Sequence, residues 1–318
     1  MASYFITGAT GFIGHLIVEK LLKEEADAKI FALVRSREKA LQMYAGENDR
    51  LVFVESDLEH LSSKLVSDSI DYMIHCAAVT TSKVMIEKPV EVADGIILGT
   101  KNVLEMAREK KVKSLVFLSS MEAYGDVPDT GARRKEHEVG VTSLTSPRSC
   151  YPLGKKMAEL YCYLYATEYG VPVKVARLAQ VFGLGLLPGE NRVFMQFAKS
   201  ARDKKDIVLK TAGMSLGNYC ESMDAVNGIL TILHKGQNGE TYNVVNEENT
   251  MRIRDMAELV AKEIAGGEIQ LVFDIADPST TGYAADTGLR MSGEKLRALG
   301  WTAEKSMKDM YEEILSEL

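Results

Sequence analysis

The chain has 318 residues, of which 46% are hydrophobic and 26% are charged, and its formal net charge at pH 7 is −7. Such a composition predicts a globular protein with room for one large domain and an appendage, and the negative charge argues against nucleic acid as the main partner. No apolar run is long enough to span a bilayer, and the start of the chain has no export-signal pattern. Four scattered cysteines and five histidines without metal-ligand spacing lead us to expect reduced thiols, a cytoplasmic location, no membrane partner and no metal site.

A glycine-rich turn follows the first apolar run, Tyr4–Ile6, and a helical pattern begins directly after it. Gly8 permits a tight turn, Gly11 leaves room for a pyrophosphate, and Gly14 lets the helix approach the strand, while the helix N-terminus faces the phosphate charge. The spacing is G-x-x-G-x-x-G, and glycine triplets alone are weak evidence. Their position between a strand and a helix predicts a dinucleotide site. Its expected cofactor contacts are Gly8, Thr10, Gly11, Phe12, Ile13 and Gly14.

Strand-like and helix-like stretches alternate through the first half of the chain. This alternation predicts a parallel, doubly wound sheet of the Rossmann type, with helices on both faces and ligands at the carboxyl ends of the strands. The expected strands are 29–34, 51–54, 72–75, 115–118 and 171–177, and the expected helices include 100–109 and 157–168.

The alternation breaks after Gly183. We expect a smaller, mixed α/β C-terminal lobe that binds the substrate, made of residues 183–219 and 251–318, beside a dinucleotide-binding domain of residues 1–182 to which residues 220–250 return. Helices are predicted at 193–202, 222–233, 253–264 and 306–318, and strands at 207–209 and 241–245.

Three positions after predicted strands point to the rest of the cofactor site. Arg35 follows the second strand, where an arginine can hold a 2′-phosphate, so it slightly favours NADP over NAD. Alternatively, Arg35 stacks on adenine and leaves NAD acceptable. Asp57, which Leu58 follows, either accepts a hydrogen bond from the adenine amino group or caps a helix. Cys76, Ala77 and Ala78 follow the fourth strand, where small side chains let a cofactor approach the backbone.

Ser120, Tyr151 and Lys155 form the most specific candidate catalytic set. Ser120 follows the fifth strand, and Tyr151 and Lys155 are four residues apart, hence adjacent on one helix face. A phenol is a poor base at neutral pH, but a neighbouring ammonium favours the phenolate, and a serine hydroxyl can hold both the phenol and a substrate oxygen.

With these motifs the chain resembles the extended short-chain dehydrogenases/reductases, in the group of nucleotide-sugar epimerases, dehydratases and decarboxylases. The resemblance spans nearly the whole chain. It implies that Tyr151 removes a sugar hydroxyl proton while hydride passes to NAD(P), that Lys155 also binds the nicotinamide ribose, and that Ser120 steadies the reacting oxygen. The motifs that carry it are Thr7–Gly14, Asp57-Leu58, 75–78, 99–103, 119–125, Tyr151-x-x-x-Lys155 and 299–301.

Glu122 lies where family dehydratases and decarboxylases place a catalytic glutamate, although it is equally open to a structural role. Met121 stands where one dehydratase class has an acidic aspartate, and a thioether donates no proton.

Three further positions depart from the family pattern. Ile96 and Gln180 replace asparagines, and Gly217-Asn218 replaces an Arg-Asp pair that commonly binds the nucleotide diphosphate. The substrate contacts that we expect instead are Gln180, Asn191, Arg192 and Arg290, each of which could equally be lobe surface.

The leading hypothesis is therefore an NAD(P)-dependent enzyme that modifies a nucleotide sugar, of the 4-epimerase or dehydratase type. Two alternatives remain open: an NADP-dependent carbonyl reductase of a non-sugar substrate, and a dinucleotide-sensing regulator without turnover. The resemblance also implies a homodimer that pairs the helices around 100–109 and 157–168, although Leu104, Tyr161 and Leu164 could equally be internal core.

Overall fold

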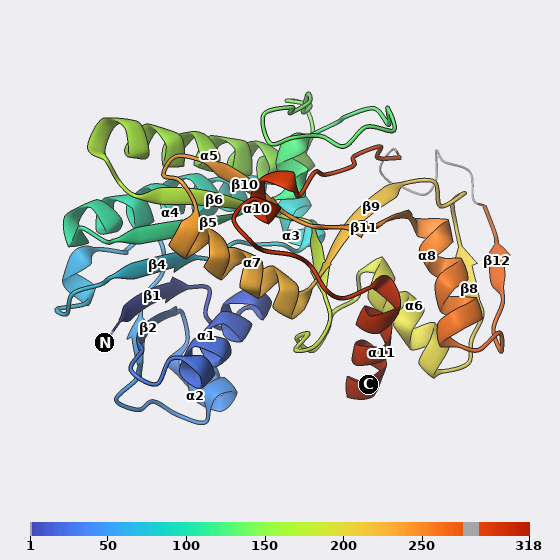
Figure 1. Ribbon diagram of the computed structural model, residues 1–318, viewed down its shortest axis with the longest axis horizontal. Coiled ribbons are helices and arrows are strands. Elements are labelled where there is room, and N and C mark those ends of the chain that lie inside the picture. The colour runs from blue at the N-terminus through green and yellow to red at the C-terminus, as the bar shows by residue number, and fades with distance from the viewer. Residues whose placement is uncertain (1, 276–285) are drawn as a thin grey trace.

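Seven parallel strands form the central sheet, in the order β10-β6-β5-β4-β1-β2-β3 (Figure 1). The computed structural model describes residues 2–275 and 286–318. Strand order reverses between β1 and β4, which is the point where doubly wound sheets open a crevice for a ligand. The predicted Rossmann-type α/β architecture is confirmed. The strands are β1 (Ser3–Thr7), β2 (Lys29–Val34), β3 (Leu51–Glu55), β4 (Tyr72–His75), β5 (Ser114–Ser120), β6 (Val173–Leu178) and β10 (Thr241–Val244).

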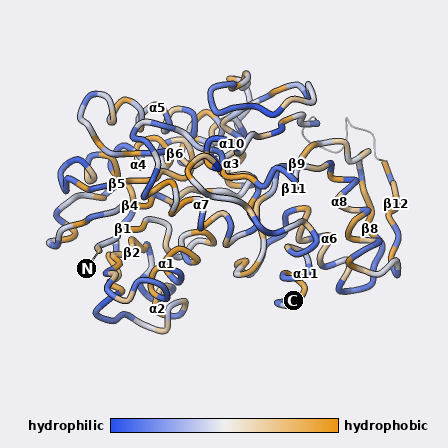
Figure 2. Tube along the Cα trace, in the orientation of Figure 1, coloured by the Kyte–Doolittle hydropathy of each residue, from blue (hydrophilic) through white to orange (hydrophobic). Residues whose placement is uncertain are grey.

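Helices cover both faces of this sheet (Figure 1). On one face α1 packs against α7, and on the other α4 packs along α5. Each layer has its own apolar core, because the strands are buried on both sides and carry apolar residues almost continuously (Figure 2). The helices of the sheet layers are α1 (Phe12–Glu24), α2 (Arg37–Tyr44), α3 (Ser82–Glu87), α4 (Pro89–Lys110), α5 (Cys150–Tyr169) and α7 (Ser222–Lys235), with short 3₁₀ turns η1 (Ser63–Leu65), η2 (Met121–Tyr124) and η3 (Pro147–Ser149).

A second group of elements, at the right of Figure 1, surrounds a separate core. Phe182 stacks on Phe194 with ring centroids 4.3 Å apart, and Tyr219 and Tyr311 meet Phe182 edge-on. The strands there are β7 (Gln180–Phe182), β8 (Ile207–Leu209), β9 (Leu216–Glu221), β11 (Asn246–Arg252) and β12 (Leu271–Phe273), and the helices are α6 (Val193–Arg202), α8 (Ile253–Leu259) with a π-turn η4 (Val260–Ile264), and α11 (Met307–Glu317).

Part of the C-terminal tail differs from the expected division, which placed all of 251–318 in the smaller lobe. The short helix α10 (Glu294–Arg297) packs on β10, and Leu289, Leu296 and Trp301 join the core on the α1/α7 face. The Trp301 indole nitrogen donates a 3.0 Å hydrogen bond to the Asp224 carbonyl oxygen at the start of α7. A buried indole needs such a partner, and no periodic pattern near Trp301 indicated which layer would provide it.

Two predicted helices are much longer than their strongest periodic stretches. Residues 100–109 and 157–168 lie within α4 and α5, which begin at Pro89 and Cys150. Pro89 is at the first helical position, where its missing N–H has no helical partner to lose. Among the described residues, no helix has the length and apolar character needed to cross a membrane.

Candidate active site

The glycine turn joins β1 to α1 as the spacing predicts. Gly8 has a φ of +69°, and the Gly11 N–H donates a 2.9 Å hydrogen bond to the Gly8 carbonyl oxygen. A Cβ at Gly14 would lie 2.2 Å from that oxygen, and a Cβ at Gly8 would lie 2.8 Å from the Ala77 nitrogen. The turn, followed by the start of α1, where the N-cap residue Gly11 provides no side-chain cap, therefore fits a pyrophosphate against the backbone. Thr10, Phe12 and Ile13 lie in this turn and in the first turn of α1.

The end of β4 lies beside the end of β1, because Thr7 and His75 are partners in the parallel register. The Thr7 hydroxyl lies 2.7 Å from His75 Nδ1 and accepts a 3.2 Å hydrogen bond from the Ala77 N–H. Burial, with a smaller effect from Lys155, lowers the pKa of His75 to about 3, so this imidazole stays neutral. The network fixes Cys76, Ala77 and Ala78, all half-buried, beside the glycine turn.

Arg35 and Arg37 differ in their partners. Arg35 is exposed at the end of β2 and forms no ion pair with any described residue, whereas Arg37 pairs with Glu47. Asp57 accepts a 2.8 Å hydrogen bond from the His60 N–H, so it caps a turn rather than a helix. Leu58 packs where a Cβ on Gly99 of α4 would stand, at 2.8 Å.

Tyr151 and Lys155 lie on the first two turns of α5, and Ser120 ends β5. Lys155 Nζ is 5.8 Å from the Tyr151 ring centroid and donates a 2.7 Å hydrogen bond to the Leu118 carbonyl oxygen. Burial lowers the pKa of Lys155 to about 8, although the Glu159 carboxylate opposes this. The helix and the strand thus bring the three predicted residues to one edge of the sheet.

Charges of both signs surround the phenol. Burial, followed by the Glu122 carboxylate, raises the pKa of Tyr151 to about 12, and Ser120, Arg148 and Arg192 oppose that rise. Arg148 Nη2 lies 2.8 Å from Glu122 Oε1. Glu122 therefore faces the phenol within an ion pair.

Arg148 and Glu159 were not predicted from the sequence. Glu159 forms a buried ion pair with Arg177 at 2.6 Å and accepts a 2.5 Å hydrogen bond from the Ser119 hydroxyl. Glu159 lies one helical turn after Lys155, which is a spacing signal that could have identified it. Arg148 lies three residues before Tyr151 but outside the helix, so helical periodicity gives no sign of its position.

The predicted substrate residues occupy different surroundings. Arg192 contributes to the electrostatic environment of Tyr151, and it also pairs with Glu190 at 2.6 Å beside Asn191. Gln180 begins β7, and Arg290 pairs with Asp129 at 3.0 Å.

The Gly217-Asn218 segment has no room for a diphosphate-binding arginine. A Cβ on Gly217 would lie 2.2 Å from the Tyr219 hydroxyl oxygen. Asn218 is fully buried, donates a 2.9 Å hydrogen bond to the Leu289 carbonyl oxygen and accepts one of 2.9 Å from the Met291 N–H. This segment is therefore structural.

The Ile96 departure is also explained by packing. Ile96 is buried and lies against Gly154 of α5, where a Cβ would be 3.4 Å from its side chain. It therefore tightens the contact between α4 and α5.

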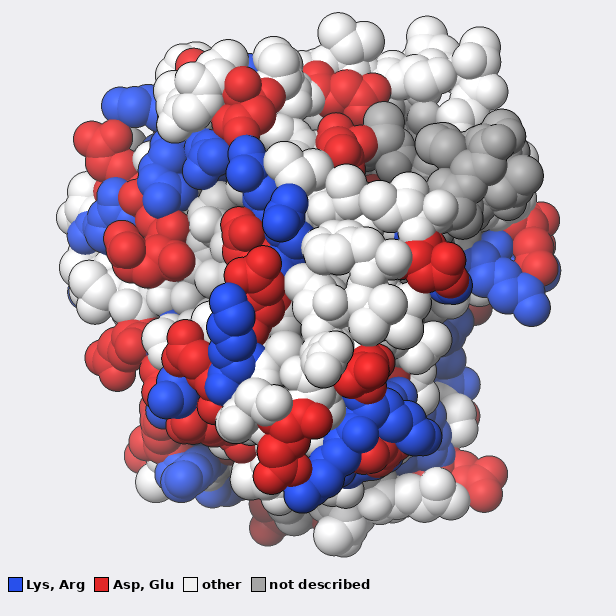
Figure 3. Space-filling model, turned by 90° about the vertical axis from the view of Figure 1, so that its right-hand side faces the viewer, with Lys and Arg blue, Asp and Glu red and all other residues white. Residues whose placement is uncertain are grey.

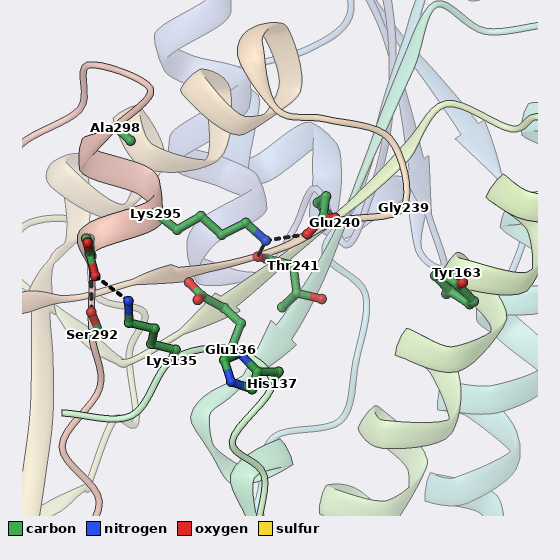
Figure 4. Close-up of a pocket in the computed structure, with 11 residues that line it drawn as sticks. Lys135, Glu136, His137, Tyr163, Gly239, Glu240, Thr241, Ser292, Lys295 and Ala298 are labelled. Carbon is green, nitrogen blue, oxygen red and sulfur yellow. Dashed lines mark hydrogen bonds and ion pairs between the residues drawn. The ribbon is translucent and has the colours of Figure 1, made fainter. Parts of the chain in front are cut away.

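A cavity of about 590 Å³ lies away from Ser120, Tyr151 and Lys155, along the outer edge of β10 (Figure 4). Lys135, Glu136 and Lys295 line it, but they pair with Glu294, the Asn243 N–H and Glu240 respectively. These contacts cover an exposed strand edge. On the face shown in Figure 3, acidic and basic side chains are interspersed, without a large area of one sign.

The chain is similar to known proteins along nearly its whole length. The model of the "NAD dependent epimerase/dehydratase family" matches residues 4–245. The dTDP-D-glucose 4,6-dehydratase of Bos taurus is 24% identical over 314 residues, which cover 96% of this chain and 85% of that protein. The crystal structure of UDP-glucose 4-epimerase from Thermotoga maritima with UDP-glucose has a TM-score of 0.81 at 24% identity and covers 99% of this chain and 97% of its own. RMD from Pseudomonas aeruginosa, complexed with NADPH, has a TM-score of 0.77 at 23% identity and covers 100% of this chain and 98% of its own. The chain belongs to the NAD dependent epimerase/dehydratase family.

Proposed function

We propose that this chain is an NAD(P)-dependent oxidoreductase that modifies a nucleotide sugar through a transient keto-sugar, in the manner of a 4-epimerase or a dehydratase. The observation that supports this most directly is the grouping of Ser120, Tyr151 and Lys155 at the carboxyl edge of the sheet that carries the glycine turn. The family match makes NAD(P) the cofactor. When bound, it supplies a hydride acceptor and then a hydride donor.

Each catalytic side chain has a distinct task in this proposal. Tyr151 takes the proton from the sugar hydroxyl as that carbon is oxidised, and Ser120 holds the reacting oxygen. Lys155 binds the nicotinamide ribose and, as a cation, favours the phenolate. Glu122, as an ion-paired carboxylate, accepts a proton from the carbon next to the ketone.

The residues that we assign to the cofactor lie at the same edge of the sheet. We assign the pyrophosphate to the glycine turn and the start of α1, adenine to the neighbourhood of Asp57 and Leu58, and the nicotinamide side to the region from Cys76 to Ala78. Arg35 slightly favours NADP, because its guanidinium is exposed and has no ion-pair partner among the described residues. The similar fold that holds NADPH is compatible with this preference.

The smaller lobe supplies the substrate side. We assign Arg192 to the sugar diphosphate or to the sugar itself, since it lies within electrostatic reach of the phenol. Gln180, Asn191 and Arg290 are further candidates, of which Arg290 must first leave Asp129.

We also infer a homodimer. Helices α4 and α5 pack side by side and leave apolar side chains exposed, including Leu98, Leu160 and Leu164, whereas Leu104 is fully buried and belongs to the core.

The four cysteines are unpaired thiols, which is compatible with the cytoplasm.

The test is to incubate the purified protein and its bound cofactor with UDP-glucose and, separately, dTDP-glucose, and to read the products by NMR. Conversion without net consumption of cofactor is expected. NADPH consumption with simple ketones and no sugar conversion would support the carbonyl reductase instead.

A further inference from the structure

Arg148 lies beside the reaction site without having been assigned a part in it. It belongs to η3, directly before α5, and its guanidinium lies 5.7 Å from the Tyr151 ring centroid. Its Nη2 atom is 2.8 Å from Glu122 Oε1, in a pair whose side chains are 34% and 38% exposed. One side chain thus contacts both the carboxylate and the phenol ring.

Arg148 is poorly placed for a purely structural role. A cation at a helix N-terminus is unfavourable, because the N–H groups there already carry partial positive charge. One guanidinium nitrogen, Nη1, is enclosed and has no hydrogen-bond partner among the described residues. Buried donors are normally paired, so the unpaired Nη1 donor does not help to stabilise the fold.

We propose that Arg148 is a positioning residue of the reaction site, which fixes the Glu122 carboxylate beside Tyr151 and supplies positive charge to the same ring. This inference rests on the proposed function, because it concerns the base of that reaction. Without Arg148, Glu122 would face the phenol as an uncompensated anion.

The charged and polar groups that face Tyr151 come from five elements. Glu122 in η2 raises the phenol pKa, while Ser120 from β5, Arg148 from η3 and Arg192 at the start of α6 lower it. Lys155 lies one turn further along α5. Arg148 and Glu122 therefore act on the phenol with opposite signs, so removal of either charge has a distinguishable effect.

The experiment follows ionisation of Tyr151 directly. The NAD⁺-bound protein is labelled with ¹³C at tyrosine Cζ, Tyr151→Phe assigns the resonance, and the signal is titrated up to the pH at which circular dichroism shows unfolding. In Arg148→Gln we expect a smaller phenolate signal than in the wild type at the highest pH at which both proteins stay folded, and in Glu122→Gln we expect ionisation of Tyr151 to begin about one pH unit lower. Arg148→Lys should remain near the wild type, and the double variant should lie between the two single ones.

The controls separate this role from stability and from the proposed function. Arg108→Gln removes a comparable ion pair with Glu105 beside the ring of Tyr169 and should leave Tyr151 unchanged. The proposal is overturned if Arg148→Gln only lowers the melting temperature, or if Arg148→Lys shifts the titration as far as Arg148→Gln. If Arg148→Gln does not fold, an unshifted titration in Glu122→Gln overturns it equally. Because no sugar is needed, failure of the wild type to convert nucleotide sugars would count against the proposed function alone.

Discussion

The Lys155 ammonium donates a 2.7 Å hydrogen bond to the Leu118 carbonyl oxygen and so ties α5 to the carboxyl end of β5. Lys155 as a whole residue is 3% exposed, and burial lowers the pKa of its ammonium to about 8. The burial that accompanies this hydrogen bond therefore disfavours the charged form of Lys155.

Because burial disfavours the Lys155 ammonium, we expect Lys155→Met to stabilise the cofactor-free protein at pH 7. Below pH 8 the folded state carries the full free-energy penalty of the lowered Lys155 pKa, which is roughly 3 kcal/mol. This penalty decreases as the pH rises above 8 toward the pKa of lysine in the unfolded chain. Loss of the bond to Leu118 offsets about 1 kcal/mol. We expect the free energy of unfolding to rise by about 1–2 kcal/mol in urea titrations, with the gain shrinking toward pH 10.

Lys174 provides the matched control. It is also buried, burial lowers its pKa to about 8, and it donates a 2.8 Å hydrogen bond to the Ser114 hydroxyl, at the opposite end of the strands. Lys174→Met should stabilise the protein similarly and retain turnover, whereas Lys155→Met should lose it. A clear destabilisation of both variants would show that the penalty is absent.

The buried pair of Arg177 and Glu159 should behave in the opposite way. Both side chains are nearly enclosed, so removal of one partner leaves an uncompensated charge. We expect Arg177→Met to lower the free energy of unfolding by about 3–5 kcal/mol. In a double-mutant cycle, Arg177→Met with Glu159→Leu should lose less than the sum of the single changes, and strict additivity would refute the coupling.

The glycine turn gives a steric prediction. Gly14→Ala places a Cβ 2.2 Å from the Gly8 carbonyl oxygen, so the turn must open and we expect NAD⁺ affinity to fall at least about tenfold, with roughly 1–3 kcal/mol of stability lost. Gly95→Ala, on α4, meets nothing within 4 Å and should gain about 0.5–1 kcal/mol. Calorimetric titration with NAD⁺ and thermal unfolding measure both effects. Unchanged NAD⁺ affinity in Gly14→Ala would place the pyrophosphate elsewhere.

Arg35 should discriminate between the two dinucleotides. Arg35→Ala is expected to weaken NADP⁺ binding about ten- to hundredfold, as expected for loss of a charge-assisted contact, and NAD⁺ binding only slightly. Arg37→Ala is the control, because Arg37 already pairs with Glu47. Equal losses for NAD⁺ and NADP⁺ in Arg35→Ala would mean that Arg35 only stacks on adenine.

The large sheet could be predicted from the sequence because its strands are short apolar runs separated by helical periodicity. The bounds 29–34 and 72–75, for example, match β2 and β4. The tail was harder to place, because Leu296 and Trp301 form no periodic pattern and their partners on α7 and β10 are distant in sequence. Arg148 could not be predicted for a related reason. Its ion-pair partner Glu122 is distant in sequence, and local spacing cannot show such a contact.

The central claim is that Tyr151 and the bound nicotinamide act on the same sugar carbon. The most direct measurement follows deuterium at C4 of a nucleotide sugar, with mass spectrometry of the product and absorbance of the reduced nicotinamide. In the wild type we expect the deuterium to stay within the sugar while reduced cofactor appears transiently, and Tyr151→Phe should abolish both events without loss of cofactor binding. Turnover that persists in Tyr151→Phe, or deuterium that is released to water, would contradict the account.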